Sequence, residues 1–214
     1  GIRDRLRSRA VIIGCGGLGG YVALFLARAG IGSLCLCDHD SFDESNLNRQ
    51  AFCREDRIGM NKALAGCGDL ALVASHVRVD VFTQKADAGS LPEILAGAHI
   101  VVDCLDDIST RRLVEKAAHE SGIPFVHGAI AGYEVFALAS MPGVSAISRL
   151  YGERELAEPA SAECRLGVPT PTPAGAAVLQ SMLVLRLLTG EALDPSNVMW
   201  HMDLAIPELE TLYF

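Results

Sequence analysis

The stretch that decides the fold is Gly14-Cys15-Gly16-Gly17-Leu18-Gly19, which matches the pattern G-x-G-x-x-G. It follows a short apolar run at 10–13 and precedes residues 21–29, whose apolar spacing predicts a buried helix. Glycines at the end of a strand let the backbone approach a phosphate at the positive end of the next helix. Tight strand-to-helix turns also favour glycine for structural reasons, so this motif alone leaves both a nucleotide site and a plain turn open.

An acidic residue follows the second predicted strand. Residues 34–37 form a buried apolar run that ends at Asp38, 19 residues after Gly19. A carboxylate at this place can accept hydrogen bonds from ribose hydroxyls. Together with the glycine turn, Asp38 predicts a nucleotide-binding site, which an NAD(P)-binding oxidoreductase would share.

The alternation of apolar strands and helices continues along the chain. Further strands are expected at 76–82, 100–103 and 124–127, with helices at 62–73 and 109–121. Such alternation predicts an α/β fold, a Rossmann-like and mostly parallel sheet with helices on both faces.

The pattern changes in the last third of the chain. Antiparallel C-terminal strands are expected at 135–140 and 198–202, and a hydrophobic helix at 174–189. Residues 142–173 are rich in Pro, Ser, Glu and Arg, and a loop of this length is a candidate mobile crossover segment. The whole range 1–214 fits a single domain.

Composition narrows the class of protein. The hydrophobic fraction of 50% is typical of a globular domain, and the formal net charge of -8 argues against a nucleic-acid surface. The apolar runs are short beside the roughly 18 to 20 residues that cross a bilayer, so no membrane span is expected. Seven scattered cysteines predict a reducing, cytoplasmic location, and no secretion signal is expected. The start at Gly1 rather than Met suggests that native residues precede it.

The segment after the second predicted strand is more specific than the glycine turn. Residues 38–50 read Asp-His-Asp-Ser-Phe-Asp-Glu-Ser-Asn-Leu-Asn-Arg-Gln, and residues 59–62 read Gly-Met-Asn-Lys. Both resemble the signature of the ThiF/MoeB/HesA family, relatives of the ubiquitin-activating enzymes. Residues 103–107, Asp-Cys-Leu-Asp-Asp, and 128–133, Gly-Ala-Ile-Ala-Gly-Tyr, resemble two further motifs of this family. The resemblance runs from about residue 9 to about residue 190 and is closest to the short ThiF-like branch.

The resemblance implies an ATP-dependent adenylyltransferase. Its expected substrate is the C-terminal carboxylate of a small ubiquitin-like sulfur carrier protein ending in Gly-Gly, ThiS-like and serving thiamine biosynthesis, with pyrophosphate released. A homodimer is implied as well, in which relatives supply an N-terminal arginine across the interface; Arg3, Arg5 and Arg7 are candidates here. Longer relatives hold a structural zinc with two Cys-x-x-Cys pairs, which this sequence lacks, so no zinc is expected.

The resemblance also assigns residues to ATP. They are Gly14, Gly16, Gly17, Gly19, Asp38, Asp40, Asn46, Arg49, Gln50, Lys62 and Asp106. Adenylation needs cations at the transferring and departing phosphates, and Arg49 and Lys62 could supply them. Mg²⁺ prefers carboxylates and phosphates, which makes Asp106 the expected metal ligand and Asp107 a supporting residue or the better helix N-cap. Asn46 would bind phosphate or position Arg49.

One cysteine is a candidate nucleophile. Cys164 stands beside Arg165 and shortly before a predicted helix, and both features lower a thiol pKa. In ThiF-like relatives a cysteine at this place takes part in sulfur transfer or thioester-like chemistry. An ordinary loop cysteine is the alternative.

Other interpretations stay open. Besides the oxidoreductase, the chain could be a non-catalytic nucleotide-binding member of the family, or a member that acts on a carboxylate of modified tRNA, against which the acidic charge counts. Arg49 could instead pair with Asp43 or Glu44 at the surface, and Lys62 could be a solvated side chain. His39 and His127 are expected to be structural.

Overall fold

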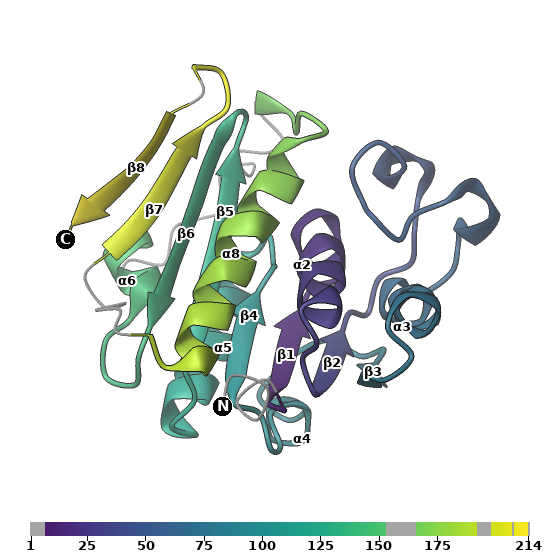
Figure 1. The fold of residues 1–214 in the computed structure, drawn as a ribbon, viewed down its shortest axis with the longest axis horizontal. Helices are drawn as coiled ribbons and strands as arrows, with labels where there is room; N and C mark the ends of the chain where they lie inside the picture. The colour runs from purple at the N-terminus through teal and green to yellow at the C-terminus, as the bar shows by residue number, and fades with distance from the viewer. Residues whose placement is uncertain (1–6, 153–165, 192–197, 207, 214) are drawn as a thin grey trace.

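A computed structural model describes residues 7–152, 166–191, 198–206 and 208–213. One eight-stranded sheet with the order β3-β2-β1-β4-β5-β6-β7-β8 forms its centre (Figure 1). The parallel strands are β1 (Arg9–Ile13), β2 (Ser33–Cys37), β3 (Arg78–Phe82), β4 (Ile100–Asp103) and β5 (Phe125–Ala131). The antiparallel strands are β6 (Glu134–Ser140), β7 (Val198–Asp203) and β8 (Glu208–Tyr213). The predicted Rossmann-like sheet with antiparallel C-terminal strands is confirmed.

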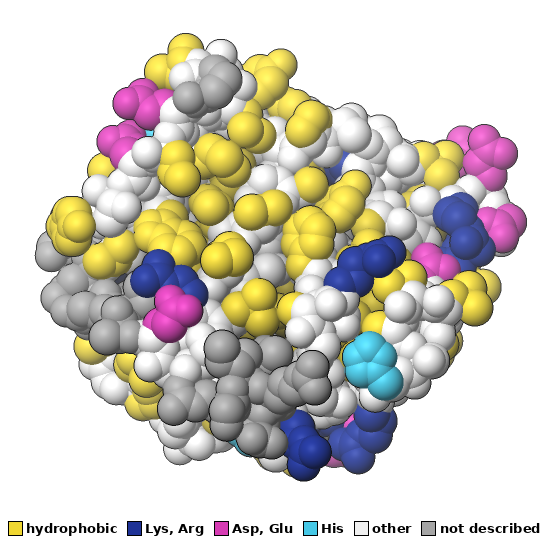
Figure 2. All heavy atoms as spheres, viewed as in Figure 1, with side chains coloured by type: hydrophobic (Ala, Val, Ile, Leu, Met, Phe, Trp, Pro, Cys, Tyr) yellow, Lys and Arg dark blue, Asp and Glu magenta, His cyan; other side chains and the backbone are white. Residues whose placement is uncertain are grey.

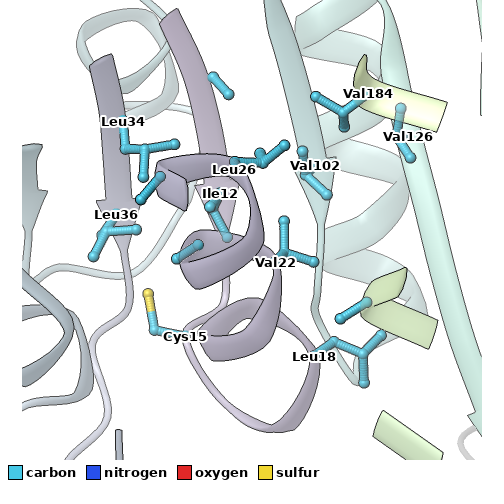
Figure 3. Packing of buried hydrophobic residues seen from close by; sticks show 14 of the residues in the cluster. Ile12, Cys15, Leu18, Val22, Leu26, Leu34, Leu36, Val102, Val126 and Val184 are labelled. Carbon is cyan, nitrogen blue, oxygen red and sulfur yellow. The ribbon is translucent and has the colours of Figure 1, made fainter. Parts of the chain in front are cut away.

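Helices cover both faces of the sheet. One layer contains α2 (Gly17–Arg28), α3 (Lys62–Val73) and α8 (Thr172–Thr189), of which α2 and α8 lie in front of the strands in Figure 1. The other contains α4 (Leu91–Ile94), α5 (Ile108–Glu120) and α6 (Ala146–Tyr151). Because successive side chains of a strand point to opposite faces, Ile12 packs in the first layer and Val11 in the second. Figure 3 shows Ile12 among side chains of β2, α2 and β4.

Helix α8 bears on the expectation that the chain contains no membrane span. Its 18 residues, with a mean hydropathy of 1.2, are long and apolar enough by length and composition alone to cross a membrane. Half of that stretch is buried inside the protein, where α8 packs against α2, β5 and β6. A core helix meets the same criterion, and this packing identifies α8 as one.

Several boundaries differ from the sequence-based expectations. Helix α2 begins within the glycine motif at Gly17, and β3 begins at Arg78 rather than at residue 76. The expected long loop at 142–173 contains α6, while residues 153–165 lie outside the described chain. A mobile crossover therefore stays a prediction. The short elements α4, η1 (Glu44–Asn46) and η2 (Glu55–Arg57) and the edge strand β8 were not anticipated.

The strand order fixes where a ligand can bind. The chain passes from β1 to β2 on one side, whereas β4 lies on the other side of β1. In open parallel sheets, such a reversal leaves a crevice at the carboxyl ends of the strands, and ligands bind there. The glycine turn follows β1, Asp38 follows β2, and Asp106 follows β4, so all three meet at this edge.

Candidate nucleotide-binding site

A cavity of about 410 Å³ opens at the carboxyl edge of the parallel strands. It brings together most of the residues predicted to bind ATP: Gly14, Gly16, Gly17, Asp38, Arg49, Gln50, Lys62 and Asp106. The other three, Gly19, Asp40 and Asn46, do not line it. The cavity thus gathers segments that follow three different strands.

The glycine turn is shaped by close contacts as well as by the cavity. Gly14 has a φ of +92°, and a Cβ at this position would lie 2.6 Å from the carbonyl oxygen of Cys104. A Cβ on Gly19 would lie 1.8 Å from the carbonyl oxygen of Gly14. Helix α2 starts at Gly17 without a side-chain cap or an acidic residue in its first turn. Its free N–H groups and positive end are therefore left for an anion in the cavity.

Asp38 is held by backbone donors on each of its oxygens. Its Oδ2 accepts a hydrogen bond from the Cys15 N–H at 2.7 Å, and its Oδ1 accepts one from the Asp40 N–H at 2.8 Å. Burial raises the pKa of Asp38 above 3.8, although these two bonds and nearby Lys62 oppose the shift. Each carboxylate oxygen can accept a further hydrogen bond, so the fixed carboxylate suits a ribose hydroxyl.

The two predicted cations are both preorganised. Lys62 is only 9% exposed, and its Nζ lies 3.1 Å from Oδ2 of Asp40, so the interpretation as a solvated side chain was wrong. Arg49 Nη1 donates to the Ser45 carbonyl at 2.7 Å and to Oδ1 of Asn48 at 2.9 Å. Within the described chain it forms no ion pair with a carboxylate, which contradicts the surface-pair interpretation.

Asn46 acts on the loop rather than on the cavity. Its Oδ1 accepts from the Asp43 N–H at 3.2 Å, completing a capping box around η1. Its carbonyl accepts from the backbone N–H groups of Arg49 and Gln50 at 3.2 and 3.0 Å. Of the two roles considered for Asn46, these contacts match the positioning of Arg49.

The adjacent carboxylates at the start of α5 differ. Asp107 caps the helix by accepting from Ser109 N–H at 3.2 Å and Thr110 N–H at 2.7 Å, and both hydroxyls bond to it too. Burial raises the pKa of Asp107, but these hydrogen bonds outweigh burial and bring it to about 2. These hydrogen bonds identify Asp107 as the N-cap of α5, the other role considered for it, and a supporting role at a cation stays a prediction.

Asp106 is exposed at the cavity and has no hydrogen-bond partner in the part of the chain that the structure describes. A free carboxylate beside the glycine turn fits Mg²⁺, which in nucleotide sites is held by one or two carboxylates and the substrate phosphates. The residues present therefore fit a nucleotide-bound cation at Asp106.

The cavity also contains residues that the sequence did not single out. Gln84 and Lys85 follow β3, and Arg111 projects from the first turn of α5. The rule that placed Asp38 at a strand's carboxyl end could have found Gln84 and Lys85. Nothing in the pattern around Arg111 distinguishes it from an exposed helix residue.

The structure bears on the buried cysteines of the sheet but not on the candidate nucleophile. Cys164, the candidate nucleophile, lies outside the described residues, as do Arg3 and Arg5. Burial raises the pKa of Cys35 to about 11 and that of Cys37 to about 12. These two thiols stay protonated at neutral pH and serve as packing residues, as expected for them.

Comparisons with known proteins agree with this geometry. The sequence pattern of the ThiF family matches residues 1–212. The chain is 34% identical to the SAMP-activating enzyme E1 of Haloferax volcanii, over 88% of this chain and 71% of that protein. It is 36% identical to the sulfur carrier protein ThiS adenylyltransferase of Bacillus subtilis, over 88% of this chain but only 56% of that protein. It is 30% identical to the molybdopterin-synthase adenylyltransferase of Salmonella typhimurium, over 85% and 73%.

Solved structures show the same fold. A crystal structure of E. coli MccB with ATP superimposes with a TM-score of 0.80 at 22% identity, over 99% of this chain and 65% of that one. A structure of PaaA gives a TM-score of 0.79 at 22% identity, over 99% and 66%. From the match along nearly its whole length and the identity to these relatives, the chain belongs to the ThiF family.

Proposed function

We propose that this protein is an ATP-dependent adenylyltransferase that activates the C-terminal carboxylate of a small ubiquitin-like sulfur carrier protein. The observation that carries the proposal is that Arg49, Lys62 and Asp106 line one cavity with the glycine turn. A dinucleotide enzyme has no need of this pair of cations beside a free carboxylate. Relatives named as adenylyltransferases support the reaction class.

The reaction places specific demands on these residues. An oxygen of the carrier's carboxylate attacks the α-phosphorus of ATP, the bond from that phosphorus to the bridging oxygen breaks, and pyrophosphate leaves. Negative charge on the phosphates is stabilised by Arg49 and Lys62, with Asp40 holding Lys62 in place. A bound Mg²⁺, held by Asp106, would neutralise further phosphate charge.

A ThiS-like carrier ending in Gly-Gly, in thiamine biosynthesis, is the preferred substrate. Support comes from the name of the Bacillus subtilis relative, while the Salmonella relative is named for molybdopterin synthase and the Haloferax relative for SAMP. Pyrophosphate exchange into ATP, measured with ThiS, MoaD and SAMP proteins in turn, tests both the reaction and the choice of carrier. Exchange with any carrier, lost in Arg49→Ala, supports the reaction. A preference for ThiS supports the pathway, and no exchange with any carrier contradicts the proposal.

We also propose that the protein acts as a cytoplasmic homodimer. Figure 2 shows hydrophobic side chains gathered over α8 and α2 on one face of the molecule. Val178 and Met182, both on α8, are 46% and 47% exposed. An exposed apolar face of this kind is typical of a subunit interface. A Val178→Glu, Met182→Glu variant should sediment as a monomer where the wild-type chain sediments as a dimer.

A further inference from the structure

Residues 103–106, which are the last residue of β4 and the three that follow it, include Asp106 and are called the β4 turn below. They are held from both faces of the sheet by buried polar side chains that belong to other elements. The contacts on the two faces are independent of each other, and of the residues that make them only Arg111 also lines the cavity. This arrangement raises the question of what the contacts do.

On the α8 face the contact is made by Gln180, which is 0% exposed. Its Nε2 donates to the carbonyl oxygen of Asp103 at 2.7 Å, and the Cys104 thiol donates to its Oε1 at 3.8 Å. A Cβ on Gly128 would lie 2.3 Å from Cδ of Gln180, so only glycine leaves room for this amide. A buried amide in an apolar helix is costly unless its hydrogen bonds are made, and here the β4 turn makes them.

On the opposite face the contacts come from β5, α5 and α6. Asp103 Oδ2 lies 2.6 Å from Nδ1 of His127, whose Nε2 lies 3.2 Å from the Tyr151 hydroxyl. Arg111 Nη1 donates to that hydroxyl at 2.8 Å, and Arg111 Nε donates to the Leu105 carbonyl at 3.1 Å. A neutral His127 with its proton on Nδ1 satisfies both of its contacts. The expected structural role of His127 is thereby confirmed.

The two sets of contacts fix the same backbone. Gln180 donates to the backbone carbonyl of Asp103, and His127 bonds to the Asp103 side chain. Arg111 donates to the backbone carbonyl of Leu105. Asp106, the next residue, has no side-chain partner of its own in the described chain. The direction of its carboxylate therefore depends on how its backbone is held.

We propose that Gln180 and Tyr151 are positioning residues that fix the β4 turn, and through it aim Asp106 at the nucleotide-bound cation. This inference rests on the proposed function for the identity of the cation. Partners that orient a metal-binding residue change metal affinity by about 10- to 100-fold when they are removed. Gln180 and Tyr151 should behave in that way although neither contacts the nucleotide.

The variants are Gln180→Met, which keeps the length of the side chain without its hydrogen bonds, and Tyr151→Phe. Ser181→Ala is the matched control, because Ser181 is also buried on α8 but its Oγ bonds to nothing in the described chain. In the pyrophosphate exchange assay with the full chain, Gln180→Met should lower kcat and raise the Mg²⁺ concentration for half-maximal rate, each about 10-fold. KM for ATP should change less than about 2-fold, and Ser181→Ala should match wild type.

A second readout does not depend on turnover. Mn²⁺ affinity, measured by electron paramagnetic resonance with a non-hydrolysable ATP analogue, should fall about 10-fold in Gln180→Met and Tyr151→Phe. Gly128→Ala should give the same loss, because its methyl group displaces the intact Gln180 amide. If Gln180→Met does not fold, these other two variants decide the question.

The outcomes separate the two proposals. Wild-type Mn²⁺ binding without exchange would contradict the adenylation reaction, while the loss of affinity in the variants would still support positioning. The positioning proposal would be overturned if the variants melt at a lower temperature but keep the Mn²⁺ affinity and kcat of wild type. A role in packing alone would give that result. Absence of Mn²⁺ binding to the wild-type chain with nucleotide would overturn it as well.

Discussion

Asp106 and Asp107 stand next to each other, yet within the described chain only Asp107 accepts hydrogen bonds. The cap at Asp107 could be predicted from sequence, because a short acidic residue before an apolar helix favours that role. The sequence could not show that the Ser109 and Thr110 hydroxyls also turn back and donate to Oδ2 of Asp107. Asp106 makes no such contact in the described chain and stays the predicted cation ligand.

Replacing Asp107 should separate the two roles. Asp107→Ala is expected to lower the free energy of unfolding in urea by about 1 kcal/mol, the usual loss for an N-cap. The same change at Asp106 should leave stability within about 0.5 kcal/mol, because Asp106 bonds to nothing in the described chain. Equal losses in both variants would contradict this assignment.

The cap has a pH dependence of known sign. The pKa of Asp107 is lowered from 3.8 to about 2, so its contribution is complete above pH 3.8 and is lost as the pH falls through about 2. The difference in the free energy of unfolding between wild type and Asp107→Ala should therefore shrink as the pH is lowered from 3.8 to about 2.

Lys62 shows what burial adds to a sequence-based assignment. The family resemblance of the segment at 59–62 suggested a phosphate contact for Lys62, while its ion pair with Asp40 could be seen only in the fold. Lys62→Ala should reduce the exchange rate by about 100-fold or more, as the loss of a transition-state charge contact does. Lys116→Ala, at a 73% exposed side chain, is the control and should be neutral. A loss under about 3-fold at Lys62 would count against its role.

Among the elements, the buried strands were the most predictable. β1, β2 and β4 each consist of apolar residues except at one end, because both of their faces are covered. The edge strand β8, Glu-Leu-Glu-Thr-Leu-Tyr, is largely exposed and gave no such pattern. α6 was missed because it lies in a segment rich in loop-forming residues, where Glu115 of α5 accepts hydrogen bonds from its first turn.

The first turn of α2 should tolerate no side chain at Gly19. Gly19→Ala would place a methyl group 1.8 Å from the Gly14 carbonyl oxygen, so we expect the free energy of unfolding to fall by at least about 2 kcal/mol. Gly68→Ala in α3 is the matched control, because a Cβ there meets nothing within 4 Å. It should stabilise the protein by about 0.5 to 1 kcal/mol. Urea unfolding of both variants checks this, and a tolerated Gly19→Ala would contradict the close approach of Gly19 to Gly14.

The C-terminal strands are joined by an ion pair with its own pH dependence. His201 of β7 stacks on Phe136 and contacts Glu134 of β6 and Glu210 of β8. Burial lowers the pKa of His201, but the two glutamates outweigh burial and raise it above 6.5. The contribution of the charged histidine is therefore complete below pH 6.5 and is lost as the pH rises through the raised pKa.

This sign can be measured. The melting temperature of wild type should exceed that of His201→Gln by about 2 °C more at pH 6 than at pH 9, since partly exposed pairs contribute up to about 1 kcal/mol. His76→Gln, at an exposed histidine, should show a smaller dependence. A difference that grows with rising pH would contradict the assignment.

For the molecule as a whole, strand order is what the sequence could not state directly. The motifs after β1, β2 and β4 were predicted, and the parallel arrangement brings them to one edge. The sequence pattern could not predict contacts between distant segments. Gln180 contacts Gly128 and Asp103 only because α8 packs across β4 and β5. Gly128 was noted only as part of a family motif, whereas the structure shows that it admits a side chain from α8.

The central claim, adenylation of a carboxylate, is tested most directly by following an oxygen atom. A carrier labelled with ¹⁸O in both oxygens of its C-terminal carboxylate is incubated with ATP, Mg²⁺ and the protein, and hydroxylamine then attacks the acyl carbon. The carbon–oxygen bond breaks, so the AMP released keeps the oxygen that attacked phosphorus. We predict one ¹⁸O atom in each AMP by mass spectrometry. AMP without the label, or no AMP formed with any carrier, would contradict the account.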